Sequence, residues 1–80
     1  MLDRLHAMKV FLAVVDEGGF TAAARHLSMT VPHVTRHIAA LEERLQTRLL
    51  QRTTRRVSLT AAGARSAERA RDILEAVDLA

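Results

Sequence analysis

The sequence contains no cysteine, so neither a disulfide framework nor a thiolate metal site is available to this chain of 80 residues. No apolar run approaches the roughly 18 residues that a membrane-spanning helix needs, and the N-terminus lacks the basic-then-apolar pattern of a signal peptide. We therefore expect a cytoplasmic protein without membrane contact. A chain this short buries a modest fraction of its surface, which favours help from a second copy.

Aromatic residues and enzyme motifs are also scarce. Phe11 and Phe20 are the only aromatic residues besides histidine, and both fall in apolar patterns, so a platform for stacking unpaired bases is missing. Single-stranded nucleic acid and RNA are therefore disfavoured as ligands. The chain has no Cys nucleophile, no G-x-S-x-G and no glycine-rich phosphate loop, so we expect no enzyme and no cofactor.

His33 and His37 have the four-residue spacing at which two imidazoles on one helix share a metal ion. The segment HVTRH lacks the glutamate of H-E-x-x-H, and the other histidines, His6 and His26, fall in other elements. We therefore expect these two side chains to be exposed polar residues rather than metal ligands.

Positive charge is concentrated in one third of the chain. The formal net charge is +3. Residues 1–32 are balanced, residues 33–59 carry six arginines against two glutamates, and residues 60–80 have a net charge of −1. A basic segment of this kind is typical of a surface that meets phosphate.

The segment Phe20 to Leu45 predicts two helices joined by a tight turn. We expect the first to cover about Thr21–Leu27 with Thr21 as its N-cap, and the second, the recognition helix, to cover about Val31–Gln46. Thr30 is a good N-cap for the second helix, and Pro32 fits its first turn. Its predicted buried stripe consists of Val34, Ile38, Leu41 and Leu45.

The flanking segments complete a small helical domain. Asp3 caps a predicted first helix that ends near Glu17, before Gly18 and Gly19, with a core stripe at Leu5, Met8, Leu12 and Val15. After the recognition helix, RLLQRTTRRVSLT (residues 48–60) changes to period two and predicts a short β-hairpin, the wing. Thr60 caps a last helix that runs to the chain end.

The sequence FTAAARHLSMTVPHVTRHIAALE, followed by RLLQRTTRRVSLTAAG, resembles the LysR-type bacterial transcription regulators. Members of that family read like FTxAAxxLxxSQPAVSRQIxxLE and continue into RLLxRTTRRxxLTxAG. The resemblance implies a mainly α, winged helix-turn-helix fold, in which a three-helix cluster and a short β-hairpin wing are followed by a long linker helix. It further implies sequence-specific binding of double-stranded DNA by a dimer, on a site with approximate dyad symmetry.

The exposed face of the recognition helix carries the predicted base-reading residues. Arg36 is the first candidate, because a guanidinium can donate two hydrogen bonds to guanine O6 and N7 or bind a phosphate. The alternative for Arg36, Thr35 and the two histidines is a solvated side chain, and the alternative for Val31 is a side chain that covers the core. Val31 and His37 stand where the family usually has Gln, which puts the family's specificity rules in doubt here. The predicted contacts on this helix are Thr30, Val31, Pro32, His33, Thr35, Arg36 and His37.

The wing supplies the second group of predicted DNA contacts. Three guanidiniums and two hydroxyls within five residues suit a phosphate backbone or an adjacent minor groove. The alternative is a charged loop that keeps a sheet edge soluble. The residues concerned are Arg52, Thr53, Thr54, Arg55 and Arg56.

The last helix carries a heptad-like seam that predicts a homodimer. Its residues are Gly63, Ala67, Ala70, Ile73, Leu74 and Val77. We divide the chain into a DNA-binding domain, residues 1–59, and a linker and dimerisation helix, residues 60–80. Because the seam stops in mid-pattern, we expect the DNA-binding portion of a longer protein, although a naturally short protein is an alternative. A different function, a helical interaction module whose basic wing meets an acidic protein, is the second hypothesis.

Overall fold

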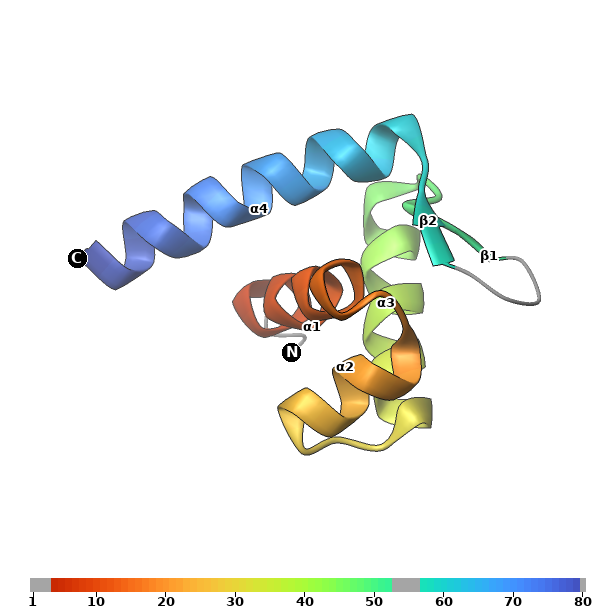
Figure 1. The fold of residues 1–80 in the computed structure, drawn as a ribbon. Coiled ribbons are helices and arrows are strands. Elements are labelled where there is room, and N and C mark those ends of the chain that lie inside the picture. The colour runs from red at the N-terminus through yellow and green to blue at the C-terminus, as the bar shows by residue number, and fades with distance from the viewer. Residues whose placement is uncertain (1–3, 53–56, 80) are drawn as a thin grey trace.

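The computed structural model describes residues 4–52 and 57–79, which form helices and one hairpin (Figure 1). A cluster of three helices lies beside the hairpin, and the last helix crosses the cluster and continues past it (Figure 1). The elements are α1 (Arg4–Glu17), α2 (Phe20–Leu27), α3 (Val31–Leu45), β1 (Leu50–Arg52), β2 (Val57–Leu59) and α4 (Ala61–Leu79). The predicted mainly α, winged helix-turn-helix architecture is confirmed. Among the helices of these ranges, none is long and apolar enough to cross a membrane.

Helix α1 is the centre of the core, and its predicted stripe is confirmed except at Leu5, although burial extends beyond that stripe. It contacts α2, α3, α4 and β2, so burial extends around most of its circumference. Leu12 is buried as expected, but Leu5 is 37% exposed, and Met8 and Val15 are only partly buried. A stripe describes a helix with one packed face, whereas this helix is packed on several sides. Its buried residues are Ala7, Val10, Phe11, Leu12, Ala13 and Val14.

The break between α1 and α2 depends on two adjacent glycines. Gly18 adopts a left-handed conformation with φ 83°, as its place after the first helix predicts. Helix α2 begins at Phe20, with Gly19 at the N-cap position and no side-chain cap, so the prediction that Thr21 caps this helix is wrong. The turn at the glycines brings Phe20 into helical conformation one residue earlier, and the N–H of Ala23 donates to the carbonyl oxygen of Gly19 at 3.1 Å.

Helices α2 and α3 are joined by a tight turn whose first residue is left-handed. Ser28 has φ 55°, and its N–H donates to the carbonyl oxygen of Arg25. The next N–H, that of Met29, donates to the carbonyl oxygen of Ala24 at 2.8 Å, which completes a Schellman motif. Met29, the apolar residue of the turn, is partly buried against the core. Ala24 is buried as well, and its small side chain allows the helices to cross closely.

The wing is a two-stranded antiparallel sheet, as its alternating pattern predicts. The strands pair Leu50 with Leu59 and Arg52 with Val57. Leu49 and Leu50 are buried, so the start of the hairpin is anchored in the same core as the helices.

Helix α4 packs against its own chain in its first half and is exposed in its second half, and the predicted dimer seam stays a prediction. Thr60 caps the helix as expected, since its Oγ1 accepts a hydrogen bond from the N–H of Gly63 at 2.9 Å. Gly63, Ala67 and Ala70 are buried against their own chain, so in this arrangement they are not available to a second copy. The C-terminal end of α4 extends beyond the helix cluster (Figure 1). In the second half of this helix, Ile73 and Val77 are 41% and 48% exposed.

Candidate nucleic-acid interface

Helix α3 separates a buried face from a polar exposed face, as predicted. Val34, Ile38 and Leu41 are buried in the core. Leu45 is 47% exposed, because the helix ends there and the chain turns away, so its assignment to the buried stripe is wrong. The exposed face is therefore set by packing on the other side of the helix.

The first turns of α3 present the predicted recognition residues to solvent. Pro32, His33 and Arg36 are exposed, Val31 is 39% exposed, and Thr35 is partly buried. The start of the helix is fixed by Thr30, whose Oγ1 accepts a hydrogen bond from the N–H of His33 at 3.3 Å. Exposed side chains at the N-terminal end of a well-capped helix have the placement that base reading in a major groove requires.

His37 lies at the edge of this face and contacts another element. Its ring is partly buried and packs edge-on against the ring of His6 in α1, with centroids 5.0 Å apart. Burial lowers the pKa of His37, and the positive charges of His6, His33 and Arg36 lower it further. The neutral imidazole is therefore favoured at pH 7, so His37 is suited to a hydrogen bond rather than to neutralising a phosphate. The partnership with His6 has no signature in the sequence.

The structure describes only part of the wing residues that are predicted to contact DNA. The backbone of Arg52 lies in β1, while its side chain is outside the described structure. Thr53, Thr54, Arg55 and Arg56 are outside the described residues. Their proposed contacts with phosphate stay predictions.

Glu42, near the end of α3, connects the recognition helix to the wing. It matches the glutamate that ends the LysR-like pattern, but the pattern gives no sign of this connection. Its Oε2 accepts hydrogen bonds from the backbone N–H groups of Leu49, at 2.7 Å, and Leu50, at 3.2 Å. The carbonyl oxygen of Leu49 in turn accepts from the N–H of Thr60 at 3.0 Å. One carboxylate therefore links the helix to the start of the hairpin.

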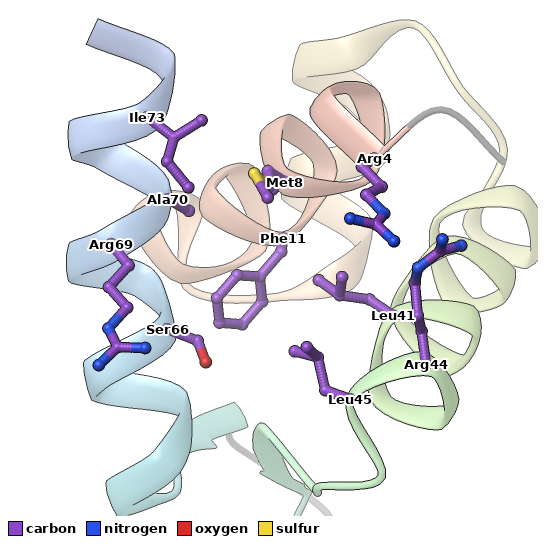
Figure 2. A pocket seen from close by; sticks show the side chains of 10 residues that line it. All are labelled: Arg4, Met8, Phe11, Leu41, Arg44, Leu45, Ser66, Arg69, Ala70 and Ile73. Carbon is purple, nitrogen blue, oxygen red and sulfur yellow. The ribbon is translucent and has the colours of Figure 1, made fainter. Parts of the chain in front are cut away.

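A groove of about 320 Å³ opens between α1, the end of α3 and α4, on an apolar base that includes Phe11, Leu41 and Ile73 (Figure 2). Its lining also holds three guanidiniums, those of Arg4, Arg44 and Arg69. None of the described residues that line it is acidic. Such a groove suits an apolar segment that carries negative charge.

The second half of α4 has that composition. Asp72, Glu75 and Asp78 are exposed on it, together with the apolar side chains of Ile73 and Val77. One ion pair holds the middle of this helix to α1, where Arg71 donates to the two carboxylate oxygens of Asp16 at 2.5 and 3.2 Å. Hydrogen bonding from Arg71 holds the pKa of Asp16 below its usual value.

The sequence model of the family described as "Bacterial regulatory helix-turn-helix protein, lysR family" matches residues 5–64. The chain belongs to the LysR family. The HTH-type transcriptional regulator YhjC of Escherichia coli (strain K12) is 45% identical to it over 73 residues, which make up 91% of this chain and 24% of YhjC.

Solved structures of the family have the same fold. In the DNA complex of the CbnR DNA-binding domain, the protein is 41% identical to this chain with a TM-score of 0.91, over 95% of this chain and 87% of that one. The BenM DNA-binding domain, solved with its catB site 1 DNA, is 38% identical with a TM-score of 0.92, over 96% and 86% of the two chains. This chain spans about a quarter of the length of the curated relatives it matches.

Proposed function

We propose that this LysR-family chain binds double-stranded DNA in a sequence-specific manner, with α3 as the recognition helix in the major groove. The observation that carries the proposal is the polar exposed face at the start of α3, opposite the buried side chains of Val34, Ile38 and Leu41. The solved complexes of CbnR and BenM, which contain DNA bound to the same fold, support it. Regulation of transcription is the corresponding role of the whole protein, which acts in the bacterial cytoplasm and is not an enzyme.

Within α3, Arg36 is the principal base-reading residue in this proposal. It is exposed, and its guanidinium has the fork that matches guanine O6 and N7. Val31 offers an apolar contact to a thymine methyl, and His33 and Thr35 offer a ring nitrogen and a hydroxyl. Thr30 and Pro32 shape the helix start, and the neutral His37 lies at the edge of the contact surface.

The wing supplies contacts to the DNA backbone. The net positive charge of residues 33–59 supports this assignment, since phosphate contact depends on charge rather than on base identity. The residues proposed for it are Arg52, Thr53, Thr54, Arg55 and Arg56. Replacing Arg55 and Arg56 by alanine is expected to weaken binding to almost any duplex.

Self-association as a homodimer is the second part of the proposal. Helix α4 acts as linker and dimerisation helix, and its exposed second half, with Ile73 and Val77, is the part left for a second copy. Leu74 is already partly packed against the core of its own chain. The arginine-lined groove is complementary in charge to the acidic end of α4, so we place the end of one α4 against the groove of the other chain.

Selection of bound duplexes from a random pool tests the DNA proposal. A single enriched motif with approximate dyad symmetry is the expected result. Equal recovery of all sequences would contradict sequence-specific binding. An acidic polypeptide of equal charge density is the control, because binding it as tightly as duplex DNA would favour the alternative of a protein-interaction module.

Sedimentation equilibrium tests the dimer. We expect Ile73→Asp combined with Val77→Asp to abolish self-association, since it places charge in an apolar contact. Arg44→Glu is expected to weaken the dimer, and Asp78→Arg in the same chain to restore part of it. A monomeric wild type at high concentration would contradict the dimer, whereas a dimer insensitive to Arg44→Glu would contradict only the use of the groove.

A further inference from the structure

The connection between α3 and β1 is held by Glu42 through two different groups. Its backbone carbonyl oxygen accepts a hydrogen bond from the N–H of Thr47 at 3.0 Å, and its carboxylate accepts from Leu49 and Leu50. The chain between the recognition helix and the hairpin is therefore bonded at three points to one residue of that helix.

These bonds matter because of where the two leucines lie. Leu49 and Leu50 are 0% and 3% exposed, so their N–H groups need partners within the protein. A carboxylate is a strong acceptor for such groups. Glu42 itself is partly buried, and the adjacent Glu43 is exposed and contributes only its backbone carbonyl to the hydrogen bonds in this connection.

The carbonyl group of Leu49 is also held by hydrogen bonds. Its carbonyl oxygen accepts from the N–H of Thr60, and the hydroxyl of Thr60 lies 3.2 Å from it. A Cβ added at Gly63 would come within 2.0 Å of the same oxygen, so the first turn of α4 lies directly on this peptide group. The backbone of Leu49 is thus the point where α3, the hairpin and α4 meet.

We propose that Glu42 is a positioning residue for DNA binding: its carboxylate sets the place of the wing relative to the recognition helix. This inference rests on the proposed role of the wing at the DNA backbone. A wing that shifts relative to α3 no longer reaches its phosphates, while the base-reading face of α3 stays unchanged. Glu42 touches no DNA in this account, and it acts through Leu49 and Leu50.

Two substitutions distinguish the effect of the length of the Glu42 side chain from the effect of its charge. Glu42→Asp keeps the charge but shortens the side chain by one methylene, so its oxygen no longer spans to both N–H groups. Glu42→Gln removes the charge but keeps the length, and its amide oxygen still accepts both bonds. If Glu42 positions the wing, the wing should be displaced in Glu42→Asp and should keep its wild-type position in Glu42→Gln. A purely electrostatic effect predicts the reverse.

The position of the wing is measured first, without DNA. Because the chain has no cysteine, spin labels attach selectively at Ala39→Cys on α3 and Ser58→Cys on β2, both exposed positions. The distance distribution between the labels is expected to broaden or shift in Glu42→Asp and to stay close to wild type in Glu42→Gln and in the matched control Glu43→Asp. An unchanged distribution in Glu42→Asp, or an equal shift in Glu42→Gln, would overturn the proposal.

Salt dependence of DNA binding gives the functional readout. The slope of log K against log salt is expected to fall in magnitude by about 0.9 for each phosphate that the wing of Glu42→Asp no longer neutralises, with Glu43→Asp unchanged. The double variant Arg55→Ala and Arg56→Ala is measured alongside. If it leaves the slope unchanged, the wing proposal fails and the label distances alone decide on Glu42. If it lowers the slope while Glu42→Asp does not, the inference about Glu42 is overturned.

Should Glu42→Asp fail to fold by circular dichroism, Glu42→Gln keeps the proposal testable. A wild-type label distance and a wild-type salt slope in that variant support it, because the amide preserves both bonds without the charge. A displaced hairpin in a folded Glu42→Gln protein overturns it.

Discussion

Helices α3 and α4 both carry apolar residues at three- and four-residue spacing, but they use them differently. Helix α3 buries Val34, Ile38 and Leu41 inside its own chain. Helix α4 buries its small residues only as far as Ala70 and leaves Ile73 and Val77 exposed. Spacing alone therefore predicts that a stripe is packed, but not which chain supplies the surface that packs against it.

The same comparison separates the two proposed partners. The unburied face of α3 is polar and lies in the basic third of the sequence, which suits DNA. The unburied part of α4 is apolar with acidic neighbours, which suits another protein surface such as the arginine-lined groove. The predictions below test how far this division holds.

The largest difference is expected between Ile38 and Ile73. Ile38→Ala leaves a cavity in the core and should lower the free energy of unfolding by about 2–5 kcal/mol. Ile73→Ala truncates a side chain that is 41% exposed and should cost less than about 1 kcal/mol in the monomer. Chemical denaturation at low protein concentration measures both. Equal losses would contradict the division of α4 into a packed half and an exposed half.

Gly63 tests the attachment of α4 to the domain. Gly63→Ala should lower the free energy of unfolding by about 1–3 kcal/mol, because the new Cβ meets a backbone oxygen that has little room to move. Gly19→Ala is the control, since nothing lies within 4 Å of its added Cβ and its backbone is extended. Thermal unfolding of the two variants should separate them clearly, and a stable Gly63→Ala protein would show that α4 is not held this closely.

Replacing the left-handed residue of the turn before α3 by glycine is expected to stabilise the protein. Ser28 has φ 55°, so Ser28→Gly should raise the free energy of unfolding by roughly 0.5–1 kcal/mol, the relief of a left-handed side-chain clash less the entropy of glycine in the unfolded state. Gln46 after α3 is also left-handed, but its side-chain amide donates to the carbonyl oxygen of Glu43, so Gln46→Gly should gain less. Denaturant titrations measure the stabilities of both variants. A lower free energy of unfolding for Ser28→Gly would contradict the strain assigned to Ser28.

The smallest effect is expected at the ion pair between α1 and α4. Both side chains are about half exposed, so Asp16→Asn should cost well under about 1 kcal/mol at neutral pH. The pKa of Asp16 is lowered in the folded state, so its contribution is present above the ordinary carboxyl pKa of 3.8 and is lost as the pH falls through the lower folded value. Wild-type and variant stabilities should therefore converge in acid, and a constant difference between them would contradict this.

Local signals in the sequence predicted the ends of the elements well. Thr30 and Thr60 accept the expected capping bonds, because a cap depends on residues within one turn of it. The helix order, the hairpin and the exposed start of α3 follow from the same kind of short-range pattern. Thr21 failed as a cap because the two glycines before it bring the chain into the helix one residue earlier.

Contacts between distant residues were not predictable in this way. The bond from Leu49 to Glu42 joins a backbone N–H to a side chain seven residues earlier, and no residue pattern marks it. The ion pair of Arg71 with Asp16 spans 55 residues. The heptad spacing of Gly63 predicts a place in a dimer seam, but no pattern indicates its close approach to the backbone oxygen of Leu49 within this chain.

Affinity of the Arg36→Ala variant for a selected duplex tests the central claim most directly. The account predicts a loss of about 1–3 kcal/mol in binding free energy, with an unchanged melting temperature, because Arg36 is exposed and leaves no cavity. Arg65→Ala, an exposed arginine of α4, removes the same charge and should lose less and keep the same preferred sequence. Equal affinity of wild type and folded Arg36→Ala protein for the selected duplex would contradict α3 as the recognition helix.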